Sequence, residues 1–229
     1  MRVRSGVRER TLVAGLLLGV SACAAPQTAQ QEGAAPRIDT PNAPSSSRDA
    51  RGEQSAEASL KAVLDALRTN AAAGRTGTVK GIGNLDVSPA PLVVLSKGMI
   101  SLIPSTPELE AAVREIGRRW RAGGRRPVRI EEFQAAFSLL DRHAQAIRAL
   151  GGADLLRPAE TDSDGRFSFQ AVPEGRWLLV TDLASPISAL LWAIPNRVIT
   201  GETAVIHLGN GNILVEGSTA RHEEGGRMQ

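Results

Sequence analysis

Hydrophobic residues are distributed unevenly along the chain, and their spacing changes from region to region. Residues 12–20 are almost entirely apolar, whereas residues 24–55 contain one large apolar residue, Ile38. Further along, apolar residues recur every three or four positions in some segments and alternate with polar residues in others. The first spacing is typical of amphipathic helices and the second of half-buried strands. The chain is therefore predicted to be mainly β, with added helices.

The first helical pattern covers residues 56–74. Leu60, Val63, Leu64 and Leu67 follow one another at helical spacing, and Gly74 is a natural stop. One apolar stripe on a short helix needs a partner, so this N-terminal amphipathic helix is expected to dock on the domain that follows it.

Alternation with a period of two dominates the rest of the chain. Seven short segments with this pattern are separated by Gly, Pro, Asn and Asp turns: 77–83, 91–104, 165–169, 175–182, 187–194, 202–209 and 212–217. Short strands at such intervals are typical of a β-sandwich. The sequence predicts a sandwich of about seven strands over residues 75–217 and a disordered tail over 218–229.

A helical hairpin interrupts this domain at residues 105–152. Thr106 is a good N-cap, Pro107 suits the first turn, and Gly151 ends the second helix. Each helix carries one apolar stripe, made of Leu109, Val113, Ile116 and Trp120 in the first and of Phe133, Phe137, Leu140, Ala144 and Ile147 in the second. These stripes are expected to face each other or the sheet.

The N-terminus has the features of a bacterial lipoprotein signal. Residues 1–22 combine a basic start with an apolar run that is too short to span a bilayer. The ending at residues 20–23 resembles the lipoprotein box, which implies cleavage between Ala22 and Cys23 and acylation of Cys23. The alternative is an ordinary signal that ends by chance at the chain's single cysteine. Ala24, in place of an aspartate, favours the outer membrane over the inner.

Between this anchor and the helix, residues 23–55 are rich in Ala, Pro, Gln and Ser. Such a composition cannot bury enough apolar surface to order itself. The segment is predicted to be a disordered tether that holds the domain off the bilayer.

The net charge of +3 comes from the predicted signal peptide. The chain has 27 basic and 24 acidic residues, and residues 1–22 hold four of the basic and one of the acidic ones. The remaining chain therefore carries 23 of each and is neutral. A nucleic-acid-binding protein is expected to keep a basic excess, so no nucleic-acid partner is predicted.

The alternating segments include motifs with a family resemblance. Thr-Asp-x-x-Gly-x-Phe at residues 161–167 is followed by Pro-x-Gly-x-Trp at 173–177, and weaker matches lie at 77–81, 100–104 and 204–208. Together they resemble the transthyretin-like sandwich called the carboxypeptidase regulatory-like domain. The resemblance implies a non-catalytic module, of a kind found beside enzymes, in surface proteins and in folds that sometimes bind sugars. The insertion at 105–152 departs from the family pattern.

The insertion contains a run of arginines. Glu115 is the only acid within the run, and the candidate surface for an anionic partner consists of Arg118, Arg119, Arg121, Arg125 and Arg126. The alternative is a solvated face with arginines favoured near a helix C-terminus. The expected partners are an envelope protein or an anionic polymer.

Other candidate chemistry is sparse. Asp162 and Asp164 precede a strand and indicate a tight turn at Gly165, although they also form a fragment of a calcium loop. No metal site, catalytic motif or cofactor is predicted. Trp120 and Trp192 are candidate platforms for stacking a sugar, and the alternative for both is a place in the core.

These observations predict a non-enzymatic envelope lipoprotein, either a structural or a protein-interaction module. A module that binds glycans or other cell-wall polymers is the alternative. Joint exposure of Trp120 and Trp192 in one groove would favour the alternative.

Overall fold

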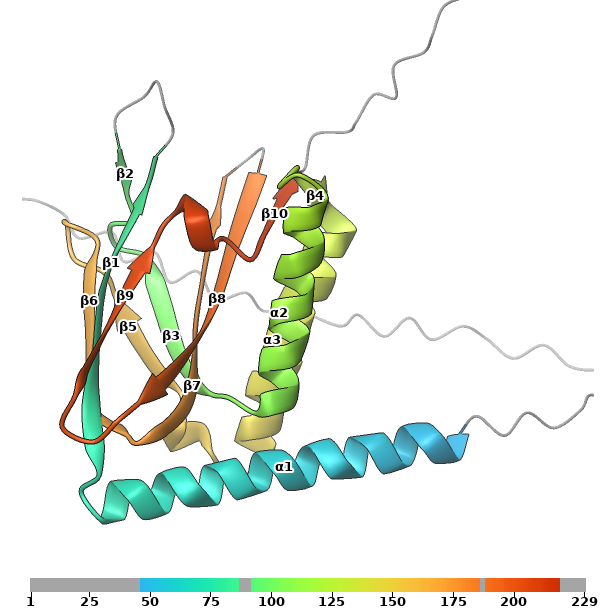
Figure 1. The fold of residues 1–229 in the computed structure, drawn as a ribbon, viewed down its shortest axis with the longest axis vertical. Helices are drawn as coiled ribbons and strands as arrows, with labels where there is room; N and C mark the ends of the chain where they lie inside the picture. Colours follow the sequence, from blue (N-terminus) through green and yellow to red (C-terminus); the bar gives the residue numbers. More distant parts are fainter. Residues whose placement is uncertain (1–45, 87–91, 186–187, 219–229) are drawn as a thin grey trace, which may run out of the picture. The chain divides into compact units, whose positions relative to one another are not determined.

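The computed structural model describes residues 46–86, 92–185 and 188–218, which form two β-sheets and three α-helices (Figure 1). The predicted signal peptide, the processing site at Ala22 and Cys23, most of the predicted tether and the tail from residue 219 lie outside the described residues. None of the described helices is long and apolar enough to cross a bilayer.

The helices lie where the sequence patterns predicted them, one before the sandwich and two within its insertion. The helices are α1 (Ser46–Ala72), α2 (Pro107–Ala122) and α3 (Ile130–Ala149). The strands are β1 (Thr76–Leu85), β2 (Val93–Val94), β3 (Met99–Pro104), β4 (Val128–Arg129), β5 (Arg157–Glu160), β6 (Arg166–Pro173), β7 (Gly175–Ala184), β8 (Ser188–Val198), β9 (Thr203–Leu208) and β10 (Val215–Ser218). Two short 3₁₀ turns lie at Ala153–Leu155 and Asn210–Asn212.

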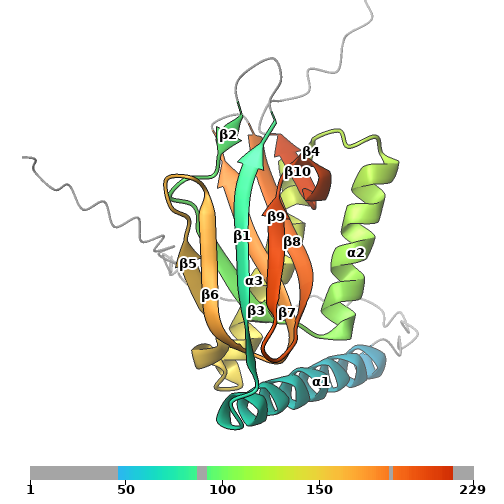
Figure 2. The same ribbon diagram turned by 60° about the vertical axis from the view of Figure 1, so that its left-hand side comes forward.

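The smaller sheet is built around β1. Strand β6 pairs with β1 in antiparallel register, β9 pairs with it in parallel register, and β2 pairs with its last residues. Figure 2 shows β9, β1 and β6 side by side in front of the larger sheet. The order of the larger sheet is β4-β10-β8-β7-β3-β5.

The space between the sheets is filled by large side chains from alternate positions. Trp177, Leu179 and Trp192 of the larger sheet are fully buried, and Leu178 and Leu191 at intervening positions are buried as well, because this sheet is covered on both faces. Both indole N–H groups are satisfied, because Trp177 donates to the carbonyl of Pro173 over 2.8 Å and Trp192 to the carbonyl of Gly209 over 3.1 Å. The sandwich predicted from the sequence is confirmed.

The insertion forms a third layer. Helices α2 and α3 lie along the face of the larger sheet that points away from the smaller one (Figures 1 and 2). Phe133 of α3 packs so closely on Gly217 of β10 that a Cβ at Gly217 would lie 2.7 Å from that of Phe133. The short strand β4, which the sequence patterns did not reveal, ties the turn between the helices to β10.

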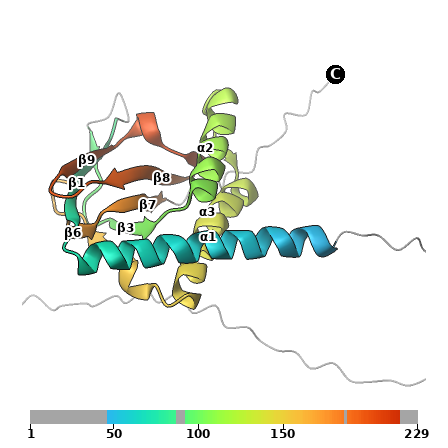
Figure 3. The ribbon, with the colours of Figure 1, turned by 60° about the horizontal axis from the view of Figure 1, so that its bottom comes forward.

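Helix α1 crosses one end of the sandwich (Figure 3). Leu60, Leu64 and Leu67 are buried, in agreement with the predicted docking stripe. The helix begins at Ser46, earlier than the predicted start at residue 56, and so takes in part of the predicted tether. Residues 48–57 include Arg, Ala, Glu and Gln, which favour helix without supplying an apolar stripe.

The number of strands also differs from the prediction of about seven. The segment 91–104 is divided into β2 and β3 by a turn at Ser96 and Lys97, while β4 and β5 are short additional strands at the two edges of the larger sheet. Edge strands of two to four residues carry too little alternation to be seen in a sequence.

Candidate functional site

Helix α2 has one buried and one arginine-rich face. Its buried residues include Leu109, Val113 and Trp120, which are held against the rest of the domain. The exposed side and the loop after it carry what we call the arginine surface: Arg118, Arg119, Arg121, Arg125 and Arg126. All five arginines that the sequence singled out lie at exposed positions.

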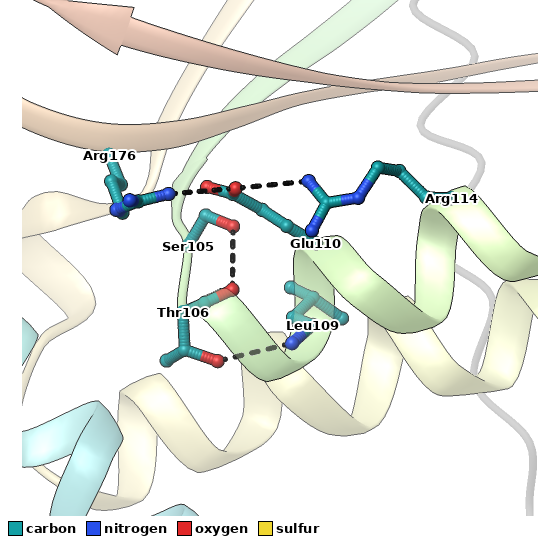
Figure 4. A network of polar contacts seen from close by, with 6 residues as sticks. All are labelled: Ser105, Thr106, Leu109, Glu110, Arg114 and Arg176. Carbon is teal, nitrogen blue, oxygen red and sulfur yellow. Dashed lines mark hydrogen bonds and ion pairs between the residues drawn. The ribbon is translucent and has the colours of Figure 1, made fainter.

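The start of α2 is anchored by its cap and by a buried carboxylate (Figure 4). The hydroxyl of Thr106 accepts a hydrogen bond from the N–H of Leu109 over 3.2 Å. Glu110, only 6% exposed, binds Arg176 of β7 at 2.9 Å and Arg114 at 3.5 Å. A buried carboxylate requires such partners. Arg114 is therefore engaged within the fold and does not belong to the arginine surface.

Glu115 neutralises part of the arginine surface. Arg118 binds its carboxylate through Nε and an Nη nitrogen, both at 2.7 Å, and Arg119 binds it through Nε at 2.6 Å. Hydrogen bonds from Arg118, and then from Arg119, lower the pKa of Glu115 to about 2. The carboxylate stays ionised at neutral pH, and one negative charge is shared by two arginines.

The loop after α2 is tied back to the helix. The indole N–H of Trp120 donates to the carbonyl of Arg126 over 2.9 Å, and the N–H of Arg125 donates to the carbonyl of Trp120 over 3.1 Å. Gly124 and Arg125 both have positive φ angles, of 78° and 57°, which turn the chain sharply. These contacts hold the backbone of the loop against the end of the helix.

Three members of the arginine surface have no carboxylate partner in the part of the chain that the structure describes. Within the described ranges, Arg121, Arg125 and Arg126 form no ion pair with a carboxylate. Of the other nearby acids, Glu132 pairs with Arg129 at 3.6 Å, and Glu108 accepts a hydrogen bond from Ser59 over 3.2 Å. The surface keeps a net positive charge on an ordered scaffold.

The candidate stacking residues are a correction to the sequence interpretation. Trp120 is 7% exposed and Trp192 is 0% exposed, so neither ring is available to a ligand. Trp192 lies in the core of the sandwich. Trp120 lies on the buried face of α2 and holds the loop through its indole hydrogen bond. Both rings follow the core alternative, since a large aromatic side chain is stabilised most by burial.

The acidic turn is explained by its own backbone. One carboxylate oxygen of Asp162 accepts the N–H groups of Asp164 and Arg166 over 2.9 and 2.8 Å. Gly165 has a φ of 75°, a conformation that suits glycine. The interpretation of Asp162 as a turn residue is confirmed. Among the described residues no group of three or more potential metal-binding side chains occurs.

Each of the two described histidines contacts a group that is neither a hydroxyl nor a carboxylate. His143 donates from Nε2 to the carbonyl of Pro104 over 2.9 Å, and burial lowers its pKa. His207 lies 2.9 Å from the side-chain oxygen of Asn84. His222 lies outside the described residues.

Comparisons with known proteins give only distant similarity. No family model matches the chain, and no curated protein matches its sequence. A structure of a candidate carbohydrate-binding protein from Pseudomonas aeruginosa is 18% identical, with 58% of this chain and 88% of that one covered and a TM-score of 0.35. A pilus backbone protein from Streptococcus pneumoniae is 11% identical, with 57% and 40% covered and a TM-score of 0.27. Similarity at this level does not extend to a ligand or an assembly.

Proposed function

We propose that this protein is a non-enzymatic lipoprotein of the cell envelope, anchored through Cys23, that uses the arginine surface to bind an acidic region of an envelope protein. The outer membrane is the proposed location. The observation that carries the proposal is the set of five exposed arginines on α2 and its loop, of which only Arg118 and Arg119 pair with a carboxylate, that of Glu115, within the described residues.

The rigidity of the surface supports a role in binding. Association costs free energy when it orders a loop, and arginines on a helix and on a loop tied to that helix avoid this part of the cost. The buried face of α2, the Glu110 ion pairs and the Trp120 hydrogen bond all act in this direction. Arginine also suits carboxylates because its planar fork can form two parallel hydrogen bonds.

The anchor defines which partners are within reach. Residues 24–45 connect Cys23 to α1. A chain of this length extends at most about 75 Å. The partner is therefore expected at the membrane surface or in the adjacent part of the envelope.

Glycan binding remains the alternative function, but the burial of Trp120 and Trp192 leaves it without the aromatic platforms that motivated it. A glycan ligand would have to be bound by polar side chains instead. An anionic polymer would still be attracted by the arginine surface and is therefore an outcome that the experiment must distinguish.

The anchor is tested by fractionation. Cys23→Ser is expected to move the protein from the membrane fraction to the fraction released by osmotic shock, with an unchanged thermal transition. Retention of this variant in salt-washed membranes would contradict lipid anchoring.

The partner is tested by crosslinking in intact cells. A photoreactive residue at Ala122, which is exposed at the end of α2, is expected to capture one acidic envelope protein. Digestion of the crosslinked material separates the alternatives, because a protease removes a protein partner and a glycan hydrolase removes a polymer. Equal capture by the variant Arg118→Glu/Arg119→Glu/Arg125→Glu would contradict the proposed surface.

A further inference from the structure

A second group of cations lies far from α2, around a depression of about 680 Å³ at the edge strand β6. Its cationic residues come from three separate segments: Lys80 from β1, Lys97 from the turn before β3, and Arg166 from the start of β6. The chain has only three lysines, and two of them line this depression.

A buried threonine holds the turn that carries Lys97. Thr161 is 3% exposed, and its carbonyl accepts the N–H of Lys97 over 3.1 Å. Its hydroxyl accepts the N–H of Gly98 over 2.9 Å and contacts the carbonyl of Leu95. The turn is thereby clamped to the start of the Asp162 turn, so Lys97 and Arg166 are held on adjoining, ordered segments.

The backbone of Lys97 is in an uncommon conformation. Its φ angle is 56°, in the left-handed region that glycine or asparagine would occupy at lower cost. Uncommon backbone conformations at well-held positions are often associated with function. Here the unfavourable position is occupied by a side chain that can supply a positive charge to the depression.

The two carboxylates that line the depression leave it with a net positive charge. Within the described parts of the chain, Lys80, Lys97 and Arg166 form no ion pair with a carboxylate. Asp162 directs one oxygen to two backbone N–H groups, and Glu160 contributes the second negative charge of the lining. Three positive charges therefore oppose two negative ones.

Neutral hydrogen-bond donors complete the lining. The hydroxyl oxygen of Ser168 accepts a hydrogen bond from Gln170 over 2.7 Å, which leaves its own O–H available to donate. Ser163 supplies another hydroxyl at the turn. The donors that line the depression thus belong to different segments of the chain.

We propose that this depression binds a phosphate group. A tetrahedral anion with several oxygens can accept from two ammonium groups, one guanidinium and a hydroxyl at once, whereas a planar carboxylate has fewer acceptor positions. Lysine binds phosphate as a point charge and arginine as a fork, so this mixture of residues suits phosphate. The site is separate from the arginine surface and does not depend on it.

The test is calorimetric titration of the full-length protein, purified in a nonionic detergent, with inorganic phosphate and with glycerol 3-phosphate at constant ionic strength. A saturable one-site response is expected for both. Lys97→Gln, Lys80→Gln and Arg166→Gln are each expected to weaken it about tenfold. Lys61→Gln and Arg197→Gln, at exposed positions outside the depression, are the matched controls and leave the affinity unchanged.

Two further variants separate this site from general electrostatics. Glu160→Gln is expected to tighten phosphate binding about threefold because it removes a like charge from the lining. The triple charge reversal of Arg118, Arg119 and Arg125 is expected to leave phosphate binding unchanged. Thermal transitions of all variants show whether the fold is retained.

The proposal is overturned if the wild-type protein shows no saturable response to either phosphate compound. It is also overturned if the control variants weaken binding as much as Lys97→Gln does. Binding to phosphatidylglycerol vesicles without binding of the two small phosphates would overturn it in favour of attraction to a lipid surface.

Discussion

The indole nitrogen of Trp120 lies 2.9 Å from the carbonyl oxygen of Arg126, to which it donates a hydrogen bond. A residue that the sequence offered as a ligand platform therefore positions the loop that carries two of the unpaired arginines. The same side chain is buried against the domain, so one residue contributes both to the packing of α2 and to the order of the loop.

Trp120→Phe is expected to preserve most of this packing and remove the hydrogen bond. The loss should lower the free energy of unfolding by about 1 kcal/mol, a usual value for one neutral hydrogen bond. Amide hydrogen exchange at Arg125 should accelerate while exchange in β7 stays unchanged. Unaltered exchange at Arg125 would show that Trp120 does not hold the loop.

Glu110 is expected to couple α2 to the larger sheet. Glu110→Gln should lower the free energy of unfolding by about 1–2 kcal/mol, since it weakens a charge-assisted hydrogen bond from Arg176 and removes an ion pair with Arg114, both of them partly exposed. Denaturant unfolding of Glu110→Gln, Arg176→Gln and the double variant measures the coupling. Strictly additive effects would contradict a direct interaction.

The Asp162 turn distinguishes a hydrogen-bond acceptor from a metal ligand. Asp162→Asn keeps a side-chain oxygen for the N–H groups of Asp164 and Arg166, so its free energy of unfolding should change by less than about 1 kcal/mol. Asp162→Ala removes that oxygen and should cost about 1–2 kcal/mol. Calcium should leave the melting temperature of both the wild type and the variants unchanged. A rise with calcium that is absent from Asp162→Asn would reveal a metal site.

His143 is expected to make stability depend on pH. Burial lowers its pKa in the folded state, so the unfolded chain binds more protons around the ordinary histidine pKa. Its contribution to stability is present in full above the unfolded value of about 6.5 and decreases as the pH falls below it toward the folded value. His143→Gln should therefore flatten the decline in melting temperature between about pH 7 and pH 5. An unchanged decline would assign the dependence to other groups.

The sequence predicted the parts of the fold that have a strong hydrophobic period. The stripe of Leu60, Leu64 and Leu67, the cap at Thr106 and the strand that contains Trp177 all lie where these patterns placed them. Elements without such a period were missed. The first residues of α1 are polar, and β4 and β5 are too short to alternate visibly.

The sequence predicted the positive charge of the candidate site, but it did not predict which of the arginines form ion pairs. The run of arginines was evident from the sequence, but Arg114 is engaged by Glu110 together with Arg176, which is far away along the chain. The cluster of Lys80, Lys97 and Arg166 was not found for the same reason, because three distant segments meet only in the folded sandwich. The left-handed backbone of Lys97 gives no sequence signal, since lysine is not a residue that usually marks a turn.

The most direct test of the proposed function is the salt dependence of crosslinking from Ala122 in a membrane preparation. The wild type is compared with the charge reversal of Arg118, Arg119 and Arg125 and with a matched reversal of three exposed cations elsewhere, Lys61, Arg142 and Arg197. Capture by the wild type and the matched control should decline as the ionic strength rises, because salt screens exposed charges. The arginine-surface variant should capture at least about tenfold less at low salt. Equal, salt-independent capture by all three proteins would contradict the account.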